Sequence, residues 1–293
     1  MLLQRGGRAF GAALRCMPRT RAVQLPAAGN WQLRLLGTSH AARDAPTAAG
    51  DTAARKPPAV RRFWRHASVG EQDGDLVIRL DARAIKTPDG RLVRIPATQR
   101  TLAWLVAGEW ESQKEFLGPH SLPLTSLVSR AIDGLSEPAA RADVIAKLLK
   151  YFHTDSVCLH DEHPRALVAL QQQHYAPLVA WARAAYGIDV ATTTDMFALR
   201  QAPAATDALR AAVGKFSPLK LAALERAVMA AKSFLIGLAL VEQRISAEDA
   251  AQAALVEATA QTQLWGELEN AHDLDNAAMR QILGASACAA MDA

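Results

Sequence analysis

The sequence predicts an α+β protein, in which a small antiparallel β-rich N-terminal domain precedes a mainly α-helical C-terminal domain. Between residues 63 and 96, short segments of alternating apolar residues are separated by turn-forming residues, which is typical of β-strands. From Pro138 onward, apolar residues recur at helical spacing. The change falls near Glu137, so we predict a β-rich domain with one or two helices over 61–137 and a helical domain over 138–293.

Residues 1–43 have the composition of a mitochondrial or plastid transit peptide. They contain seven arginines and no lysine, aspartate or glutamate. The whole chain has 33 basic and 29 acidic residues, so removing seven arginines leaves 26 against 29, a net charge of −3. Arg34 to Arg43 resembles a two-step mitochondrial processing site, which predicts a mature start near Asp44. The basic pI of about 9.1 therefore belongs to the leader, and a nucleic-acid partner loses its support.

The next segments predict an arm followed by a small sheet. Residues 44–60 are rich in Pro, Ala and Thr without periodicity, as in a flexible arm, and the folded part is expected to begin at Arg61. Leu76, Ile78 and Leu80 alternate as in a half-buried strand. Turn-forming residues lie at 70–74, at 81 and at 88–90, so we expect antiparallel strands between them.

Helical spacing predicts the remaining elements. We expect helices over about 101–117, 124–135, 140–159, 166–187, 206–216, 217–241 and 246–276. Ser217 and Pro218 fit a helix start, and Gly187 fits a helix end. The apolar run 227–241 contains Lys232 and is too short to span a bilayer, so it predicts a buried helix and no membrane insertion.

Residues 246–276 are expected to form one long helix, because they lack proline and begin with Ser246 three residues before Asp249, as in a helix cap. Five polar or aromatic residues recur at about four-residue spacing, so they share one face that turns gradually around the helix axis. They are Glu257, Gln261, Trp265, Glu269 and His272. Two interpretations remain open. Either Trp265 is in the core and Glu269 pairs with His272, or the face is a polar recognition surface.

No motif predicts catalysis or a cofactor. Gly214-Lys215 lacks the spacing and the hydroxyl residue of a phosphate loop, and neither a dinucleotide fingerprint nor a nucleophile elbow occurs. The densest run of potential metal ligands crosses a helix end without metal-site spacing, and consists of His153, Asp155, His160, Asp161 and His163. The three cysteines predict no disulfide framework, which fits a reducing compartment.

Several short strings occur along the chain in a set order and spacing. They are Lys86-Thr87-Pro88, Ile95-Pro96, Leu102-Ala103, Glu109-Trp110 with Gln113, Leu122 to Leu127, Ala131-Ile132-Asp133, Thr154 to Cys158, Pro177 with Trp181, Tyr186-Gly187, Gly237-Leu238-Ala239, Glu257, Gln261, Trp265-Gly266, Glu269 and His272-Asp273. Together they resemble the mitochondrial ATP synthase F1 assembly factors, a chaperone family that binds the F1 α subunit. They cover about residues 61–275. The chain departs from the family at Leu159-His160, Tyr175-Ala176 and Ala260.

The resemblance implies a non-enzymatic chaperone of the mitochondrial matrix that needs no cofactor and is a monomer when free. It also implies that the partner is the unassembled α subunit, which the chaperone covers until assembly. The residues that the resemblance assigns to partner binding are Glu257, Gln261, Trp265, Gly266, Glu269, His272 and Asp273. Glu269→Lys is then expected to impair binding of the α subunit more than folding.

The alternative function is that of a matrix hydrolase or metalloenzyme. It would use the cluster of Glu269, His272 and Asp273, in which two carboxylates and an imidazole follow one another closely in the sequence. Stoichiometric metal in the purified protein would favour this alternative.

Overall fold

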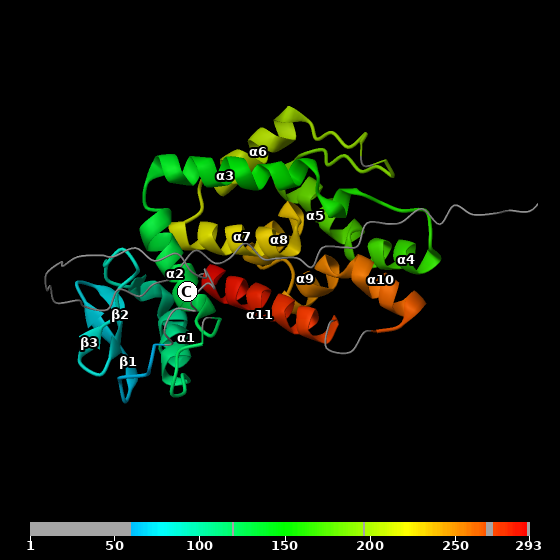
Figure 1. The fold of residues 1–293 in the computed structure, drawn as a ribbon. Coiled ribbons are helices and arrows are strands. Elements are labelled where there is room, and N and C mark those ends of the chain that lie inside the picture. The colour runs from blue at the N-terminus through cyan, green and yellow to red at the C-terminus, as the bar shows by residue number, and fades with distance from the viewer. Residues whose placement is uncertain (1–59, 119, 196, 268–271, 292–293) are drawn as a thin grey trace, which may run out of the picture.

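The computed structural model describes residues 60–118, 120–195, 197–267 and 272–291. Within these residues the predicted α+β class is confirmed, because a small antiparallel sheet is followed by helices. Figure 1 shows the sheet at one end of the molecule, with the helices extending away from it towards α4 and α10. The predicted transit peptide, residues 1–43, and the predicted arm, residues 44–60, lie outside the described residues except for residue 60.

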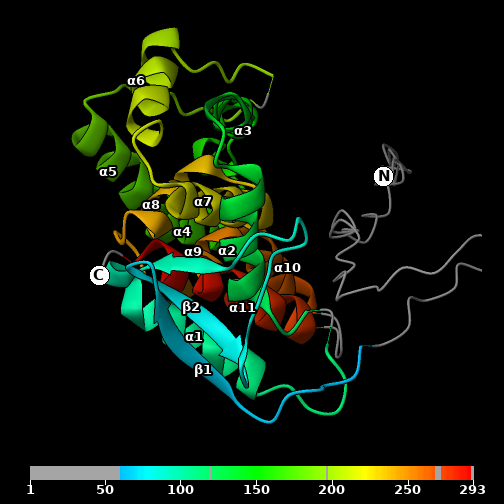
Figure 2. The ribbon, with the colours of Figure 1, turned by 90° about the vertical axis from the view of Figure 1, so that its left-hand side faces the viewer.

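Four short strands form the sheet: β1 (Ala67–Gln72), β2 (Asp75–Leu80), β3 (Arg83–Ala84) and β4 (Arg94–Pro96). β2 pairs antiparallel with each of the other three. Asp73 and Gly74 both have positive φ, which gives the β1–β2 hairpin the turn that matches the twist of its strands. Helix α1 (Arg100–Glu111) packs against the sheet (Figure 2), where it contacts β1, β2 and β4. Leu76, Ile78 and Val106 are buried in the shared core.

The other α-helices are α2 (Pro123–Gly134), α3 (Pro138–His153), α4 (Arg165–His174), α5 (Ala176–Tyr186), α6 (Pro203–Val213), α7 (Pro218–Ala231), α8 (Phe234–Val241), α9 (Ala247–Ala254), α10 (Val256–Trp265) and α11 (His272–Ala290). Ser217 caps α7 by accepting a hydrogen bond from the Lys220 backbone N–H, and Gly187 ends α5 in the left-handed conformation, as expected. Helix α2 contacts both α7 and α11. The domain boundary near Glu137 stays a prediction.

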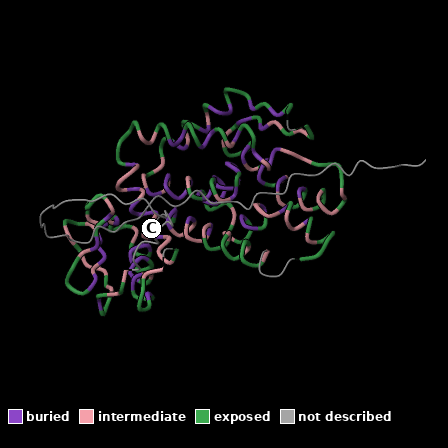
Figure 3. The backbone as a smooth tube through the Cα atoms, in the orientation of Figure 1, coloured by how far each residue is buried: buried purple, intermediate pink, exposed green. Residues whose placement is uncertain are grey.

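The helical part is organised around α7 and α8, in which buried residues are concentrated (Figure 3). Every residue of α8 is buried, and α7 contacts α2, α3, α8 and α11. The two central helices approach closely at Gly237, where a Cβ would lie 2.6 Å from a methyl carbon of Val228. No helix in the described part of the chain is both long and apolar enough to cross a membrane.

The single helix expected over 246–276 is wrong, because the chain forms α9, α10 and α11 there. The Ser246 cap is present, with Asp249 completing a reciprocal capping box. The first break is at Leu255, where ψ is 13°, and the second is at Gly266, where φ is 85° and ψ is 167°. Other expected helices also divide, 166–187 at Tyr175 and 217–241 at Lys232, whose φ is +57°.

Helix α11 runs back along the molecule. Its Arg280 guanidinium makes a bidentate contact with the carboxylate of Glu248 on α9, at 2.6 and 2.8 Å. At its other end, the Gln99 side-chain amide donates to the Met291 carbonyl at 3.5 Å, so α11 ends beside the start of α1. Cys158 and Cys288 are both free thiols.

Candidate functional site

Three of the predicted site residues follow one another along α10. Its inner residues Val256 and Ala260 are buried, and the helix packs against α4. Glu257 and Gln261 are exposed, and Trp265 comes one turn later. The four-residue spacing therefore places these side chains along the solvent face of α10, although the helix is shorter than expected.

Trp265 is exposed, so the interpretation that places it in the core is wrong. Its side chain is 79% exposed, and that of its neighbour Leu264 is 49% exposed. An indole held in solvent at the end of a helix is unusual, since tryptophan is highly buried on average. Gly266 ends the helix with φ of 85° and ψ of 167°, a backbone conformation that is essentially restricted to glycine.

The remaining predicted residues lie around the start of α11. His272 is half-buried, Asp273 is exposed, and Leu274 after them is 61% exposed. Glu269 lies outside the described residues. Because Gly266 and His272 are six residues apart, their Cα atoms are separated by at most roughly 20 Å. We call the described residues Glu257, Gln261, Leu264, Trp265, Gly266, His272, Asp273 and Leu274 the α10–α11 surface.

The α10–α11 surface is acidic and apolar. Between Arg244 and Arg280 the sequence has seven acidic residues and no lysine or arginine. One of the seven, Glu248, is paired with Arg280, which holds the pKa of Glu248 low, at about 2. A partner with apolar and basic groups would complement such a surface.

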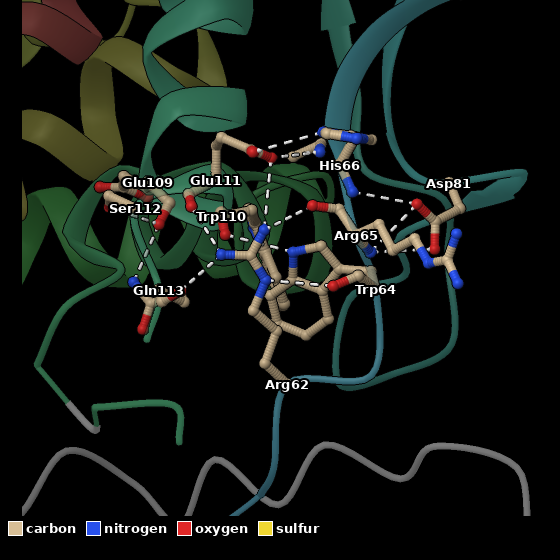
Figure 4. Close-up of polar contacts among 11 residues, drawn as sticks. Arg62, Trp64, Arg65, His66, Asp81, Glu109, Trp110, Glu111, Ser112 and Gln113 are labelled. Carbon is tan, nitrogen blue, oxygen red and sulfur yellow. Dashed lines mark hydrogen bonds and ion pairs between the residues drawn. The ribbon is translucent and has the colours of Figure 1, made fainter. Parts of the chain in front are cut away.

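Three residues of the resembling strings, Glu109, Trp110 and Gln113, lie at the end of α1 close to Arg62 and Trp64 (Figure 4). The Arg62 guanidinium donates to the carbonyls of Trp64, Arg65, Glu111 and Gln113 at 2.6 to 3.1 Å. It thereby binds the chain before β1 to carbonyl groups at the end of α1. The Trp64 indole donates to the Trp110 carbonyl at 3.3 Å, and both rings are buried.

Glu109 joins α1 to α2. Its carboxylate accepts from the backbone N–H groups of Leu124 and Thr125 at 2.6 and 2.9 Å, and from the Thr125 hydroxyl at 2.8 Å. Burial raises the pKa of Glu109, although these hydrogen bonds act in the opposite direction. Glu111 instead accepts from the Ala67 N–H at 2.6 Å, so the two carboxylates point to different elements, as expected for residues two apart.

Asp155 similarly joins the end of α3 to α8. Its carboxylate accepts from the N–H groups of Val157 and Leu235 at 3.1 and 2.9 Å. Burial raises the pKa of Asp155 to about 6, against the lowering effect of hydrogen bonds that include one from Ser233. Asp161 accepts from the Gln171 amide at 2.9 Å. In the part of the chain that the structure describes, no three His, Cys, Asp or Glu side chains are placed to hold a metal ion.

Comparison with known proteins gives the family. Residues 61–183 match the family described as ATP12 chaperone protein. Protein atp12, mitochondrial, of Schizosaccharomyces pombe is 30% identical over 238 residues, covering 78% of this chain and 82% of the relative. This chain belongs to the ATP12 chaperone family. Protein ATP12, mitochondrial, of Saccharomyces cerevisiae is 28% identical, with 78% and 83% of the two chains covered.

The fold of this ATP12 family member agrees with that assignment. The crystal structure of Atp12 from Paracoccus denitrificans has a TM-score of 0.69 and 29% identity, and covers 78% of this chain and 97% of its own. The chain is therefore a chaperone of F1 ATP synthase assembly, and mitochondrial like its two yeast relatives. The resemblance of the sequence strings to the F1 assembly factors is confirmed.

Nothing in the sequence indicated that Leu264 and Leu274, the apolar part of the α10–α11 surface, are exposed. In one continuous helix these two leucines could equally belong to the buried side, so only the polar residues at four-residue spacing pointed to a surface. The glycine at 266 is a signal that could have divided the helix, since glycine commonly follows a helix end.

Proposed function

We propose that this chain is a non-enzymatic chaperone of the mitochondrial matrix, and that its α10–α11 surface binds the unassembled α subunit of F1. The observation that carries the proposal is the exposure of Trp265, 79% of whose side chain is open to solvent on a helix that packs by its opposite face. Family membership supports the F1 sector as the source of the client, meaning the protein that the chaperone protects.

Physical chemistry supports this use of the surface. Tryptophan is among the residues that contribute most to binding when a partner covers them, and apolar neighbours help to exclude water. Leu264 and Leu274 supply such neighbours, and the surrounding carboxylates favour a basic client surface. An α subunit waiting for its β partners exposes a large interface, which such a surface would cover reversibly until the stronger final contacts replace it.

The experiment compares two exposed tryptophans. Trp265→Ala is expected to weaken binding of purified α subunit by at least about tenfold, while its thermal unfolding stays that of the wild type. The control is Trp104→Ala, which removes an indole that is 54% exposed on α1, in the sheet-containing end of the molecule. Affinity and melting temperature are measured for all three proteins.

The control is expected to bind within about twofold of the wild type. Equal losses for the two variants would exclude a special role for the α10–α11 surface. Recovery of the partner from matrix extract, with identification by mass spectrometry, tests the client itself. A partner other than the α subunit would overturn the assignment.

A further inference from the structure

A second candidate binding region is a cleft between the sheet and the helical part. It has a volume of about 610 Å³ and is bordered by β4, the end of α2 and the beginning of α7. Pocket volumes of about 300–1,000 Å³ commonly hold ligands in proteins. The cleft borders the sheet, whereas α10 lies near the opposite end of the molecule (Figure 1).

The cleft combines an apolar floor with positive charge. Its floor includes Ile95, Val128 and Leu219, which are buried aliphatic residues. Two arginines, Arg91 and Arg94, lie along it. Helix α7 begins at the cleft, so the partial positive charge of its N-terminus adds to theirs.

The two arginines differ in their partners. Arg94 is paired with Asp73 at 2.8 Å and with Asp75 at 3.8 Å, so its charge is largely balanced. Arg91 donates to two uncharged acceptors, the Ile132 carbonyl at 2.8 Å and the Ser136 hydroxyl at 3.2 Å. Among the described residues no carboxylate forms an ion pair with Arg91, so this guanidinium lies at the cleft bound only to uncharged acceptors.

We propose that this cleft is a second client-binding site, which takes an extended segment of the client with an apolar side chain next to an aspartate or glutamate. The apolar side chain would cover the floor formed by Ile95, Val128 and Leu219, and the carboxylate would pair with Arg91. Arginine and carboxylate groups form strong charge-assisted hydrogen bonds. The proposal rests on the proposed chaperone function and adds the chemistry of the client segment.

Two separated contacts would also explain how a modest chaperone surface can hold a large subunit. A client bound at the α10–α11 surface presents its remaining chain to the cleft at a raised effective concentration. The cleft favours an acidic segment and the α10–α11 surface a basic one, so the two sites would fix the orientation of the client.

The first test changes the charge at Arg91. Arg91→Lys, Arg91→Gln and Arg91→Glu are compared for binding of purified α subunit, with Arg83→Glu on β3 as the control for a charge reversal on an exposed strand. Affinity is expected to fall in the order Lys, Gln, Glu, with about a tenfold loss for Arg91→Glu and a change within twofold for Arg83→Glu. The loss is expected to shrink at high salt.

The second test locates the segment. A photo-crosslinking amino acid placed at Thr98, which is exposed on the cleft, is expected to capture an α-subunit peptide that contains an apolar residue beside an acidic one. Melting temperatures of all variants show whether a loss of binding comes from unfolding.

The outcomes separate this inference from the chaperone function. If the α subunit binds in a Trp265-dependent manner, but Arg91→Glu binds like Arg83→Glu or position 98 captures no acidic segment, the second site is wrong and the first stands. If Arg91→Lys and Arg91→Gln lose affinity together with stability, Arg91 is only structural. If wild-type protein does not bind the α subunit at all, both proposals fall.

Discussion

Two regions of the molecule hold similar side chains in opposite environments. At the junction of the sheet with α1 and α2 these side chains are hydrogen-bonded within the protein, and on the α10–α11 surface they are exposed. Glu109 is bound by two backbone N–H groups and a hydroxyl, and Trp110 is buried and donates to the Thr125 hydroxyl at 3.0 Å. Glu257 and Trp265 are exposed instead. All four residues belong to the strings that resemble the family. Glu109 and Trp110 stabilise the fold, whereas Glu257 and Trp265 remain available to a partner.

The difference gives a rule for interpreting such residues. Some carboxylates and indoles are hydrogen-bonded to groups of other elements. Removing such a side chain leaves those groups without a hydrogen-bond partner. The same side chain in solvent can be removed at little cost to folding. Variants of the first kind should therefore change stability, and variants of the second kind should change client binding.

Among the side chains that are hydrogen-bonded within the protein, Asp155 should have the largest effect on the free energy of unfolding. This effect depends on pH. Its pKa is about 6 in the folded protein and 3.8 in the reference state, a difference worth about 3 kcal/mol at 1.36 kcal/mol per unit. Because folding raises this pKa, the folded state holds the proton more tightly. The stabilisation is therefore complete below pH 4 and is lost as the pH rises through about 6.

The measurement compares wild type with Asp155→Asn by denaturant unfolding between pH 4 and pH 7.5. Other carboxylates titrate equally in both proteins, so the difference between their free energies of unfolding isolates Asp155. Relative to the variant, the wild type should lose about 2–3 kcal/mol over this range. Parallel curves would show that the carboxyl group titrates normally.

Asp155 also shows why sequence periodicity could not place every helix. The class of fold, the caps at Ser217 and Ser246 and the end at Gly187 were predictable, because each is set by neighbouring residues. The division of 217–241 has one local signal, Ser233, which caps α8 by accepting a hydrogen bond from the Ile236 N–H at 3.1 Å. The second contact at this helix start is not local, because the N–H of Leu235 is bound by Asp155, eighty residues away. A contact of that range leaves no local pattern in the sequence.

Glu109→Ala should destabilise the protein by about 2–3 kcal/mol, since it removes the acceptor that caps α2 and leaves two N–H groups and a hydroxyl without it. Chemical denaturation measures the loss. Glu257→Ala is the matched change on α10 and should stay within about 0.5 kcal/mol of the wild type. Equal losses would remove the distinction between the two regions.

The candidate site was predictable only in part. Four-residue spacing correctly placed Glu257, Gln261 and Trp265 on one face of a helix, but exposure depends on what packs against that helix, and α4 lies about 90 residues earlier in the chain. The cleft beside Arg91 was not predictable for the same reason. Its walls come from β4, α2 and α7, which no local pattern brings together.

Gly237→Ala tests a stability effect that comes from packing between α7 and α8 and not from hydrogen bonds. The added methyl would lie 2.6 Å from the Val228 side chain and 3.0 Å from its backbone nitrogen, so α7 and α8 must move apart. Overpacking of this kind costs about 1–3 kcal/mol, although alanine favours the helix more than glycine does. A melting temperature equal to that of the wild type would show that the two helices separate easily.

Gly266→Ala should have the smallest effect on stability and yet should affect the client. Alanine at φ of 85° and ψ of 167° is strained, but no atom lies within 4 Å of the added methyl group, and the exposed end of α10 can rearrange to relieve the strain. Global unfolding should therefore change by about 1 kcal/mol or less, because the opening stays local.

Rearrangement at Gly266 also moves the indole of Trp265 beside it, so affinity for the α subunit should fall several-fold more than stability explains. Gly284→Ala is the control, since it adds a methyl group within α11 where nothing lies within 4 Å, and alanine there favours the helix. If both glycine variants bind the client like the wild type, the position of Trp265 does not matter. Binding would then depend on the acidic character of the α10–α11 surface and not on the shape that Gly266 gives to the end of α10.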